Sequence, residues 1–358
     1  MRIQQTGLLE WDKDRATPAF TLYTPSGEET TRLIDLSGEV RHSWKLPGRP
    51  GAYAYLLENG NLLAATNAQK APAGLSAGGG LISEIDWDGN IVWQHADDLQ
   101  HHDFKRLENG NTMYLAWERL TEEQQAKVKG GIPGTEHDGH IYGDVIKEIT
   151  PDGEVVWEWH TATQLDYDEF PINPQCPRDE WAHANTCRPC ADNGVIVNFR
   201  NNNLMGIIDK DTGKFRWTMC NWDFGQQHDV QMLENGNILF FGNGADLLRR
   251  GPEGGSNVTE IDPKTNEIVW QYRGNPPTSF LSWWISGCQR LWTGNTHITE
   301  GGYGRLFEVT PEGDIVWEFI NPVFFEGPPQ FGRQNRVFRS YRYAADGPEL
   351  QGRAGEPQ

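Results

Sequence analysis

An internal repeat limits the folds open to this sequence more than any other feature. Residues 84–93 recur with small changes at residues 148–157 and 308–317. Each copy reads as a short β run, a turn built from Asp, Pro and Gly, and a second β run closed by Trp, which is the pattern of a hairpin. Together with the looser copies, the closing tryptophans are Trp44, Trp93, Trp157, Trp217, Trp270 and Trp317.

A second repeat lies between these copies. The motif Leu-Glu-Asn-Gly-Asn occurs at residues 57–61, 107–111 and 233–237, and degenerate forms surround Gly194 and Gly294. Because Asn-Gly favours a tight type I′ turn, each of these sites marks a second hairpin. Two hairpins per repeat predict a four-stranded blade, and blades repeated around an axis form a β-propeller.

The two ends of the chain are predicted to close the propeller. The first repeat lacks its innermost strand, whereas the β run at residues 337–343 has no partner of its own. We expect this run to pair with the N-terminal strands near residues 20–23, 33–35 and 40–44, because such closure leaves no exposed sheet edge. A solenoid of hairpins would instead need capping units at its ends. The sequence therefore predicts an all-β fold, a six-bladed β-propeller with four-stranded blades.

The propeller is predicted to form a single domain over residues 1–345. The longest connection within it is an inserted rim loop at residues 119–144, and long loops in compact domains are often lids or binding loops. Residues 346–358 are rich in Gly, Pro and Glu, so we expect them to form a flexible C-terminal tail.

The charge of the chain restricts its partners. The formal net charge is −19. This charge argues against nucleic acid or an anionic membrane surface as the binding partner, because proteins that bind either one usually present a basic surface. An anionic small-molecule substrate would need a locally cationic site. No apolar run is long enough to span a membrane, and the N-terminus has no apolar leader segment. We therefore expect a cytoplasmic protein, or a periplasmic one if a leader has been removed.

The cysteines favour reduced thiols over a disulfide framework, because there are 5 of them. Cys187 and Cys190 have the spacing of a redox or metal motif, but no second pair of this kind completes a zinc site.

Histidines gather where the innermost strands are predicted to begin. In each blade the start of the innermost strand and the end of the next strand share one rim of the propeller. His102, His183 and His228 stand near the starts of innermost strands in three successive blades. A structural role would not demand His at the same place in consecutive blades, so we expect these imidazoles to meet at the mouth of the central channel.

Other polar residues are predicted on the same rim, at the starts of innermost strands, at the ends of the strands next to them, in the inserted loop or on the closing strand. These further candidates for substrate contact are Arg200, Asn185, Asn243, His101, His140 and Arg339. An alternative interpretation of His101 is a solvated rim residue, and strand alternation lets only some arginines of the closing strand face the channel. Asp103 and Asp229 each follow one of the channel histidines, and each is expected to orient an imidazole or to cap a turn.

Three functions suit such a cluster, which lacks a Ser-centred nucleophile motif. In the first, an anionic group such as sulfuryl is transferred, with Arg and protonated His binding its oxygens while a neutral imidazole attacks or takes a proton. In the second, His102, His183 and His228 hold a divalent metal ion in a lyase or hydrolase, with an open position for substrate or water. The third is a noncatalytic propeller that serves as a binding platform.

Several motifs resemble those of the arylsulfate sulfotransferase family of six-bladed propellers. They lie at residues 20–23, 33–35, 101–103, 181–185, 200, 227–229 and 302–309. The resemblance covers about residues 18–345. Its most specific part is the His-x-Asn motif at His183 and Asn185, followed by Arg200.

The resemblance implies a ping-pong transfer of a sulfuryl group from an aryl sulfate to a phenol through a sulfated histidine, without a required cofactor. In this sequence His228 would be the nucleophile. The residues that would hold the sulfuryl oxygens and stabilise developing charge are His102, His183, Asn185 and Arg200.

Overall fold

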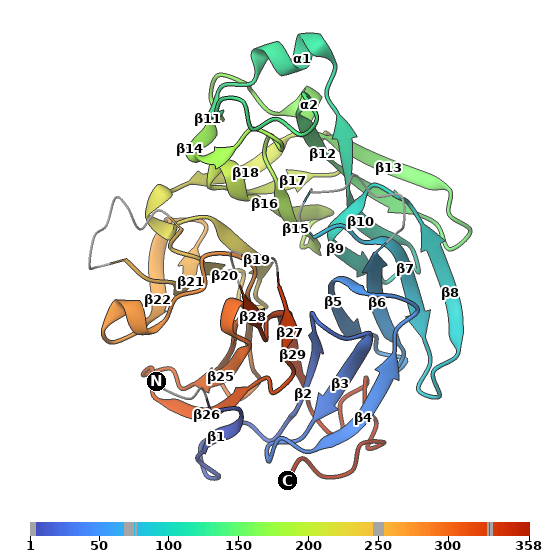
Figure 1. Cartoon of the computed structure of the whole chain (residues 1–358), viewed down its shortest axis with the longest axis vertical. Coiled ribbons are helices and arrows are strands. Elements are labelled where there is room, and N and C mark those ends of the chain that lie inside the picture. Colours follow the sequence, from blue (N-terminus) through green and yellow to red (C-terminus); the bar gives the residue numbers. More distant parts are fainter. Residues whose placement is uncertain (1–4, 68–74, 76, 246–253, 328, 330–331) are drawn as a thin grey trace.

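The computed structural model describes residues 5–67, 75, 77–245, 254–327, 329 and 332–358, and it confirms the six-bladed β-propeller. Four-stranded antiparallel sheets stand around a central axis, as Figure 1 shows. We number the blades from the N-terminus and give the strands of each from the axis outward.

Blade 1 consists of β29 (Val337–Tyr343), β2 (Phe20–Pro25), β3 (Thr30–Ile34) and β4 (Val40–Lys45). Blade 2 consists of β5 (Pro50–Leu56), β6 (Leu62–Asn67), β7 (Gly80–Ile85) and β8 (Ile91–Ala96). Blade 3 consists of β9 (Gln100–Arg106), β10 (Thr112–Arg119), β12 (Tyr142–Ile149) and β13 (Val155–His160).

Blade 4 consists of β15 (Ala184–Cys190), β16 (Gly194–Phe199), β17 (Leu204–Asp209) and β18 (Phe215–Cys220). Blade 5 consists of β19 (Gln227–Met232), β20 (Ile238–Gly242), β21 (Asn257–Asp262) and β22 (Glu267–Arg273). Blade 6 consists of β23 (Gly287–Arg290), β24 (Thr296–Glu300), β25 (Arg305–Val309) and β26 (Ile315–Ile320), with β1 (Gly7–Trp11) added outside β26.

The predicted closure between the chain ends is confirmed. Strand β29 pairs antiparallel with β2, so that Phe20 lies opposite Tyr343 and Tyr23 lies opposite Ser340. Every residue of β29 is buried, because the strand is innermost in its blade and faces the channel. The C-terminal strand therefore completes the N-terminal blade.

The repeated tryptophans join each blade to the next. Trp44 at the outer edge of blade 1 donates its indole N–H to the carbonyl of Asp86 in the outer turn of blade 2, at 3.0 Å. The same bond recurs around the ring, and Trp317 of blade 6 closes the circle on the carbonyl of Leu36, at 2.8 Å. Trp93, Trp157 and Trp270 likewise donate to backbone carbonyls of the next blade, whereas Trp217 donates to the side-chain Oδ1 of Asn266 in the outer turn of blade 5, at 2.9 Å. This geometry explains why Trp ends each repeat and why Asp, Pro or Gly turns precede it.

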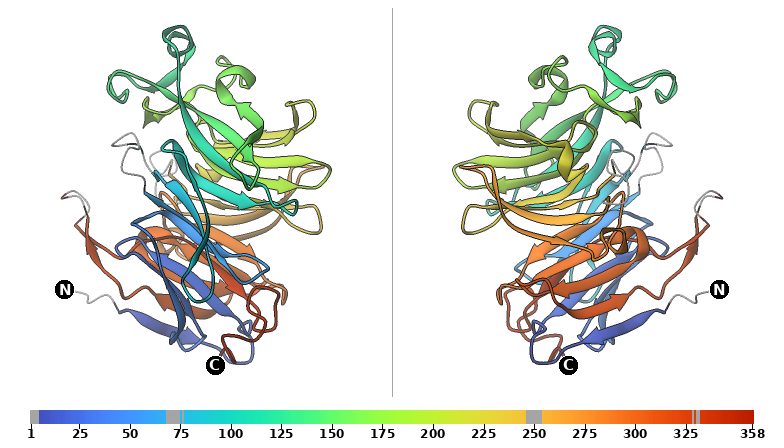
Figure 2. Two further views of the ribbon diagram at one scale, coloured as in Figure 1. Left: turned by 90° about the vertical axis from the view of Figure 1, so that its right-hand side faces the viewer. Right: turned by 90° about the vertical axis from the view of Figure 1, so that its left-hand side faces the viewer.

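The inserted loop of blade 3 has structure of its own. It carries α1 (Glu122–Lys127) and β11 (Gly130–Ile132), and β11 pairs in parallel with β14 (Ile172–Pro177). Arg178 holds it in place by donating to Glu136 at 2.8 Å. The two views of Figure 2 and Figure 1 place this insertion beyond the outer edge of the blades, at the end of the molecule farthest from the chain termini.

The remaining short elements connect or extend the blades. They are α2 (Thr161–Gln164), β27 (Phe325–Glu326), β28 (Arg333–Gln334), and the 3-10 turns η1 (Arg200–Asn202), η2 (Trp222–Phe224), η4 (Pro277–Ser279) and η5 (Gly301–Tyr303). No helix in the described part of the chain is both long and apolar enough to cross a membrane.

The segment predicted as a flexible tail packs against the propeller. Leu350 is fully buried in the same apolar cluster as Trp44 and Leu56, which lie in blades 1 and 2. The carbonyl of Gln358 accepts a hydrogen bond from the backbone of Ser37 at 3.1 Å. These contacts attach the tail to the outside of the first two blades.

Candidate active site

Backbone irregularities aim the channel histidines. In β9 the pairing passes from Phe104 directly to His101, so that His102 and Asp103 form a bulge, and a similar bulge at Asp229 interrupts β19. The φ angles of His102, His183 and Asp229 are 49°, 54° and 54°, in the left-handed region that residues other than glycine rarely adopt. Bulges and positive φ values at the starts of inner strands turn side chains toward the mouth of the channel.

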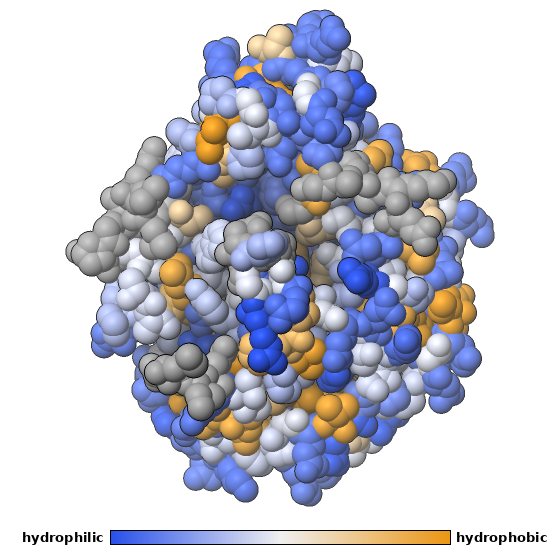
Figure 3. Space-filling view, viewed as in Figure 1, coloured by the Kyte–Doolittle hydropathy of each residue, from blue (hydrophilic) through white to orange (hydrophobic). Residues whose placement is uncertain are grey.

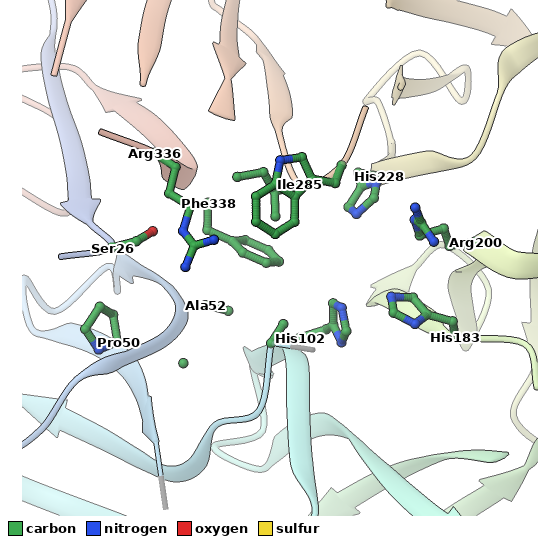
Figure 4. A pocket seen from close by; sticks show the side chains of 13 residues that line it. Ser26, Pro50, Ala52, His102, His183, Arg200, His228, Ile285, Arg336 and Phe338 are labelled. Carbon is green, nitrogen blue, oxygen red and sulfur yellow. The ribbon is translucent and has the colours of Figure 1, made fainter. Parts of the chain in front are cut away.

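A cavity of about 230 Å³ lies at this mouth. His102, His183, His228 and Arg200 line one end of it, and Ser26, Pro50 and Arg336 line the other end, as Figure 4 shows. Phe338 and Ile285 lie between the two ends. The structure thus brings together the three histidines that the sequence places in consecutive blades, with Arg200 beside them.

Asn243 fixes the proton on His228. The side-chain amide N–H₂ of Asn243 donates to the carbonyls of Ser282 at 2.7 Å and Ile285 at 2.8 Å, which leaves its Oδ1 as an acceptor. That oxygen lies 2.5 Å from Nδ1 of His228, so Nδ1 carries the proton. Nε2 of His228 is therefore the ring nitrogen with a lone pair. Asn243, predicted to contact substrate, instead orients the imidazole and does not line the cavity.

The electrostatic surroundings keep His228 neutral. Burial and then the positive charge of Arg200 hold the pKa of His228 well below its ordinary value. A neutral imidazole with a free lone pair is the form that attacks an electrophile.

Glu180 holds His183 in a similar way. Its Oε2 lies 2.9 Å from Nδ1 of His183 and accepts a second hydrogen bond from the indole of Trp117 at 3.1 Å. Burial raises the pKa of Glu180, but the charges of His183 and His101 and the hydrogen bonds from His183 and Trp117 together outweigh burial. The pKa therefore lies below its ordinary value, and the carboxyl is ionised. The sequence does not predict Glu180 as a site residue. Its position three residues before His183 is the one feature of the sequence that points to such a contact.

His102 completes the cluster from blade 3. Its ring lies edge-on to that of His183, with centroids 4.7 Å apart. Its Nδ1 lies 2.8 Å from Nδ1 of His101, so one of the two nitrogens donates to the other. Burial, followed by repulsion from His183 and His101, holds the pKa of His102 well below its usual range. His102 is thus a second neutral imidazole at the cavity wall.

Arg200 supplies positive charge beside these neutral rings. Its backbone N–H donates to the carbonyl of His183 at 3.0 Å, and its Nη1 donates to Asn201 at 3.2 Å. Within the described residues, no carboxylate lies within 4.0 Å of its guanidinium. The remaining donors of Arg200 are available to an anion in the cavity.

The solvated interpretation of His101 is wrong. This ring is fully buried, stacks on Trp117 with centroids 4.5 Å apart, and supports His102 from behind. Burial lowers the pKa of His101 to about 3. His101 is not one of the residues that line the cavity, and its contact with substrate stays a prediction from the sequence.

Asn185 and Arg339 are also absent from the cavity wall. The side-chain amide of Asn185 donates to the carbonyl of Gln227 at 2.9 Å and so supports the residue before His228. Arg339 is fully buried deeper in the channel and donates to the carbonyl of Asn185 at 2.6 Å. Both residues therefore stabilise the backbone that carries the site from the interior of the channel.

His140 lies in the inserted loop of blade 3 and forms an isolated β-bridge with His137. It is not one of the residues that line the cavity. In the described structure His140 therefore lies apart from the three channel histidines, and its contact with substrate stays a prediction from the sequence. The insertion is anchored by Arg178 at the outer edge instead of folding over the channel.

The aspartates next to the channel histidines face inward. Asp103 accepts from Nη1 of Arg339 at 3.0 Å and from the backbone of Cys187 at 2.8 Å, and Tyr53 donates to it as well. Asp229 accepts from Arg188 and from Tyr341. Neither aspartate shares a hydrogen bond or an ion pair with a histidine in the described structure. They cross-link inner strands of different blades, which corrects the prediction that they orient imidazoles or cap turns.

Cys187, Cys190, Cys220 and Cys288 are free thiols in the described structure, which agrees with the reduced state that the sequence favours. Among the described residues, no group of three or more His, Cys, Asp and Glu side chains is arranged to share a metal ion. The divalent metal suggested for His102, His183 and His228 stays a prediction from the sequence.

Comparisons with known proteins agree with the fold and add a family. A model of the arylsulfotransferase (ASST) family matches residues 54–322. No curated protein sequence matches the chain. A solved protein of unknown function from Bacteroides caccae has a TM-score of 0.57 at 14% identity, covering 91% of this chain and 99% of its own.

A streptogramin B lyase structure has a TM-score of 0.50 at 13% identity, covering 96% of this chain and 95% of its own. At such low identity these two structures establish similarity of fold alone.

Proposed function

Since this chain belongs to the arylsulfotransferase family, we propose that it moves a sulfuryl group from an aryl sulfate ester to a phenolic acceptor through His228. The observation that carries the proposal is the hydrogen bond from Nδ1 of His228 to Asn243. It leaves Nε2 with a lone pair on a histidine that lines the cavity. The depressed pKa of His228 keeps that lone pair available at neutral pH.

In the first half-reaction, Nε2 of His228 attacks the sulfur of the aryl sulfate. The new N–S bond forms as the bond between sulfur and the aryl oxygen breaks, and the electron pair of that bond goes to the aryl oxygen. His183, hydrogen-bonded to the ionised Glu180, donates a proton to this oxygen, and the phenol leaves. The enzyme then carries the sulfuryl group on His228.

Arg200 and His102 stabilise the sulfuryl group during its transfer. The guanidinium of Arg200 has donors without a carboxylate partner in the described chain, and it provides charge-assisted hydrogen bonds to the sulfuryl oxygens. His102 lines the same end of the cavity. Donors fixed in place before the reaction stabilise developing negative charge without reorganising.

In the second half-reaction a phenolic acceptor takes the place of the first phenol. Its oxygen attacks sulfur while His183 takes its proton, the N–S bond breaks, and the electron pair returns to Nε2 of His228. Both half-reactions use the same groups in opposite directions, as microscopic reversibility requires. No oxidant or reductant is consumed.

Rapid-mixing kinetics with 4-nitrophenyl sulfate test the proposal. In the absence of acceptor, the full-length protein should release a burst of nitrophenol close to one equivalent per active site, and the addition of phenol should restore turnover. His228→Ala should show no burst, and its rate should fall by about 10³-fold or more. The variant Arg333→Gln is a matched control, because Arg333 is exposed and does not line the cavity. A His228→Ala protein that retains the burst contradicts the proposal.

A further inference from the structure

We propose that the cavity holds a second anion-binding subsite at Arg336, which selects aromatic substrates bearing a carboxylate at the end opposite the transferred group. The assignment rests on the proposed function for the identity of the substrate. It concerns the end of the cavity that the histidines do not reach (Figure 4).

Arg336 is held between aromatic rings. The centre of its guanidinium lies 4.9 Å from the ring centroid of Trp284 and 5.0 Å from that of Phe325. Its backbone carbonyl accepts a hydrogen bond from Ser26 at 3.1 Å, which ties it to the turn between β2 and β3. Rings stacked against a guanidinium fix its plane while leaving its N–H groups free at the edge. Such a group is prepared for a planar, bidentate acceptor.

The guanidinium of Arg336 makes no ion pair or hydrogen bond with any described residue. Other arginines near the propeller axis or between blades do find carboxylates: Arg106, Arg290, Arg305, Arg339 and Arg342. Arg336 is half-buried, and burial lowers its pKa. A partly desolvated cation without an acceptor is costly, and an anionic ligand would remove that cost.

A second cavity meets the first at Arg336. This cavity has a volume of about 670 Å³. The residues that line both cavities are Ser26, Pro50, Gly51, Ala77 and Arg336. The second cavity is also lined by Arg49 and by the exposed carboxylate Glu326, neither of which forms an ion pair in the described chain. Among the described residues that line the second cavity, Arg49 and Arg336 are cations and Glu326 is an anion, so the net charge of this described lining is positive.

The order of groups along the cavity matches an aromatic ring with an anion at each end. Arg200 and the histidines stand at one end, Phe338 and Ile285 in the middle, and Arg336 at the other end (Figure 4). The chain carries a formal net charge of −19, which repels a doubly anionic substrate unless the site itself is cationic. Figure 3 shows strongly hydrophilic side chains on the face that surrounds the central hollow.

Binding without turnover tests the subsite. Titration calorimetry of the full-length protein compares 4-hydroxybenzoate with 4-hydroxybenzamide, which has the same shape and no charge. The benzoate should bind at least about tenfold more tightly, and Arg336→Gln should reduce that preference to about twofold or less. Arg336→Lys should retain part of the preference, because it keeps the charge but loses the bidentate geometry.

The control is Arg333→Gln, which removes a neighbouring arginine stacked on Phe324 that lines neither cavity. It should keep the full preference of the wild type. Equal binding of the two ligands, undetectable binding of both, or a preference that survives Arg336→Gln overturns the subsite. Because no sulfuryl donor is present in the calorimetry, its outcome does not depend on the transfer reaction. If His228 formed no sulfuryl adduct, the transfer reaction would be overturned, but the anion-binding subsite would not.

Discussion

The mouth of the channel and its interior differ in how they use polar side chains, although residues that are neighbours on one strand supply both regions. His102 and His228 line the cavity, and Nε2 of His228 has a lone pair that is free to react. Asp103 and Asp229 instead point into the interior, where they accept hydrogen bonds from buried side chains. In the interior Arg339 lies between the two aspartates, at 3.0 Å from Asp103 and 3.5 Å from Asp229.

The difference shows how the His-Asp pair at the start of an innermost strand serves both functions: the histidine takes part in the proposed chemistry, and the aspartate stabilises the fold. In the interior the charges neutralise each other. Burial raises the pKa of Asp103, but the charges of Arg339, Arg188 and Lys105 together with the hydrogen bond from Tyr53 outweigh burial, so the pKa lies below its ordinary value. At the mouth, Arg200 lacks a carboxylate among the described residues, and His228 is kept neutral beside it. We expect substitutions in the interior to unfold the protein and substitutions at the mouth to slow the reaction.

The largest expected effect is the loss of Arg339. The variant Arg339→Met leaves Asp103 and Asp229 buried with less compensating charge, and this should cost about 3–5 kcal/mol of the free energy of unfolding. Urea denaturation measures this loss. The matched variant at the mouth, Arg200→Met, should cost less than about 1 kcal/mol. Equal losses from the two variants would remove the distinction between the two regions.

The second prediction concerns the pH profile. The charge of Arg200 lowers the pKa of His228, and the protonated imidazole cannot attack, so activity is lost as the pH falls through that pKa. Arg200→Gln should therefore move the acid limb of kcat/KM to higher pH, and should lower its plateau about 10²- to 10³-fold. An acid limb that stays in place or moves to lower pH would contradict the electrostatic account.

The third prediction separates a general acid from a structural carboxylate. Glu180→Gln removes the charge that holds Nδ1 of His183 and should lower the rate about 10- to 100-fold. If His183 protonates the departing oxygen, phenyl sulfate, a poor leaving-group ester, should lose more than 4-nitrophenyl sulfate. Equal losses for both esters would mean that Glu180 acts only on structure.

The smallest effect is expected from Lys105, farther along β9. Its ammonium lies 4.0 Å from the ring centroid of Tyr55, and burial together with the charge of Arg188 lowers its pKa to about 7. Above that pH the unfolded chain still binds the proton while the native protein does not, so wild-type stability should rise with pH from about 7 toward the ordinary lysine value.

The slope from this one group is at most about 1.4 kcal/mol per pH unit and is reduced by the partial exposure of the side chain. Lys105→Met should remove it, which urea denaturation at two pH values would detect. A variant with the same pH dependence as the wild type would show that Lys105 does not titrate in this range.

Much of the fold follows from local sequence, because every repeat carries its own turn residues and its own closing Trp. The pairing of β29 with β2 also follows, since an unpaired strand and an incomplete blade complement each other. Strand β1 was not predicted, because residues 7–11 contain no copy of the repeat and their partner β26 is already complete within its blade.

The site was only partly predictable because the inner strands bulge. Simple alternation cannot say that His102 reaches the cavity while His101 turns into the core, since the bulge at His102 and Asp103 changes the direction of the side chains. Glu180 and Arg336 act through partners distant in sequence, Trp117 and Trp284 among them. Such partners become visible only when the blades are assembled.

The most direct test of the central claim is to find where the sulfuryl group resides. The full-length protein is mixed with 4-nitrophenyl sulfate without acceptor, quenched at alkaline pH, digested and mapped by mass spectrometry. We predict one acid-labile sulfuryl group, located on His228, which disappears when phenol is added before the quench. A sulfuryl group on another residue, or rapid transfer with no adduct at all, would contradict the account.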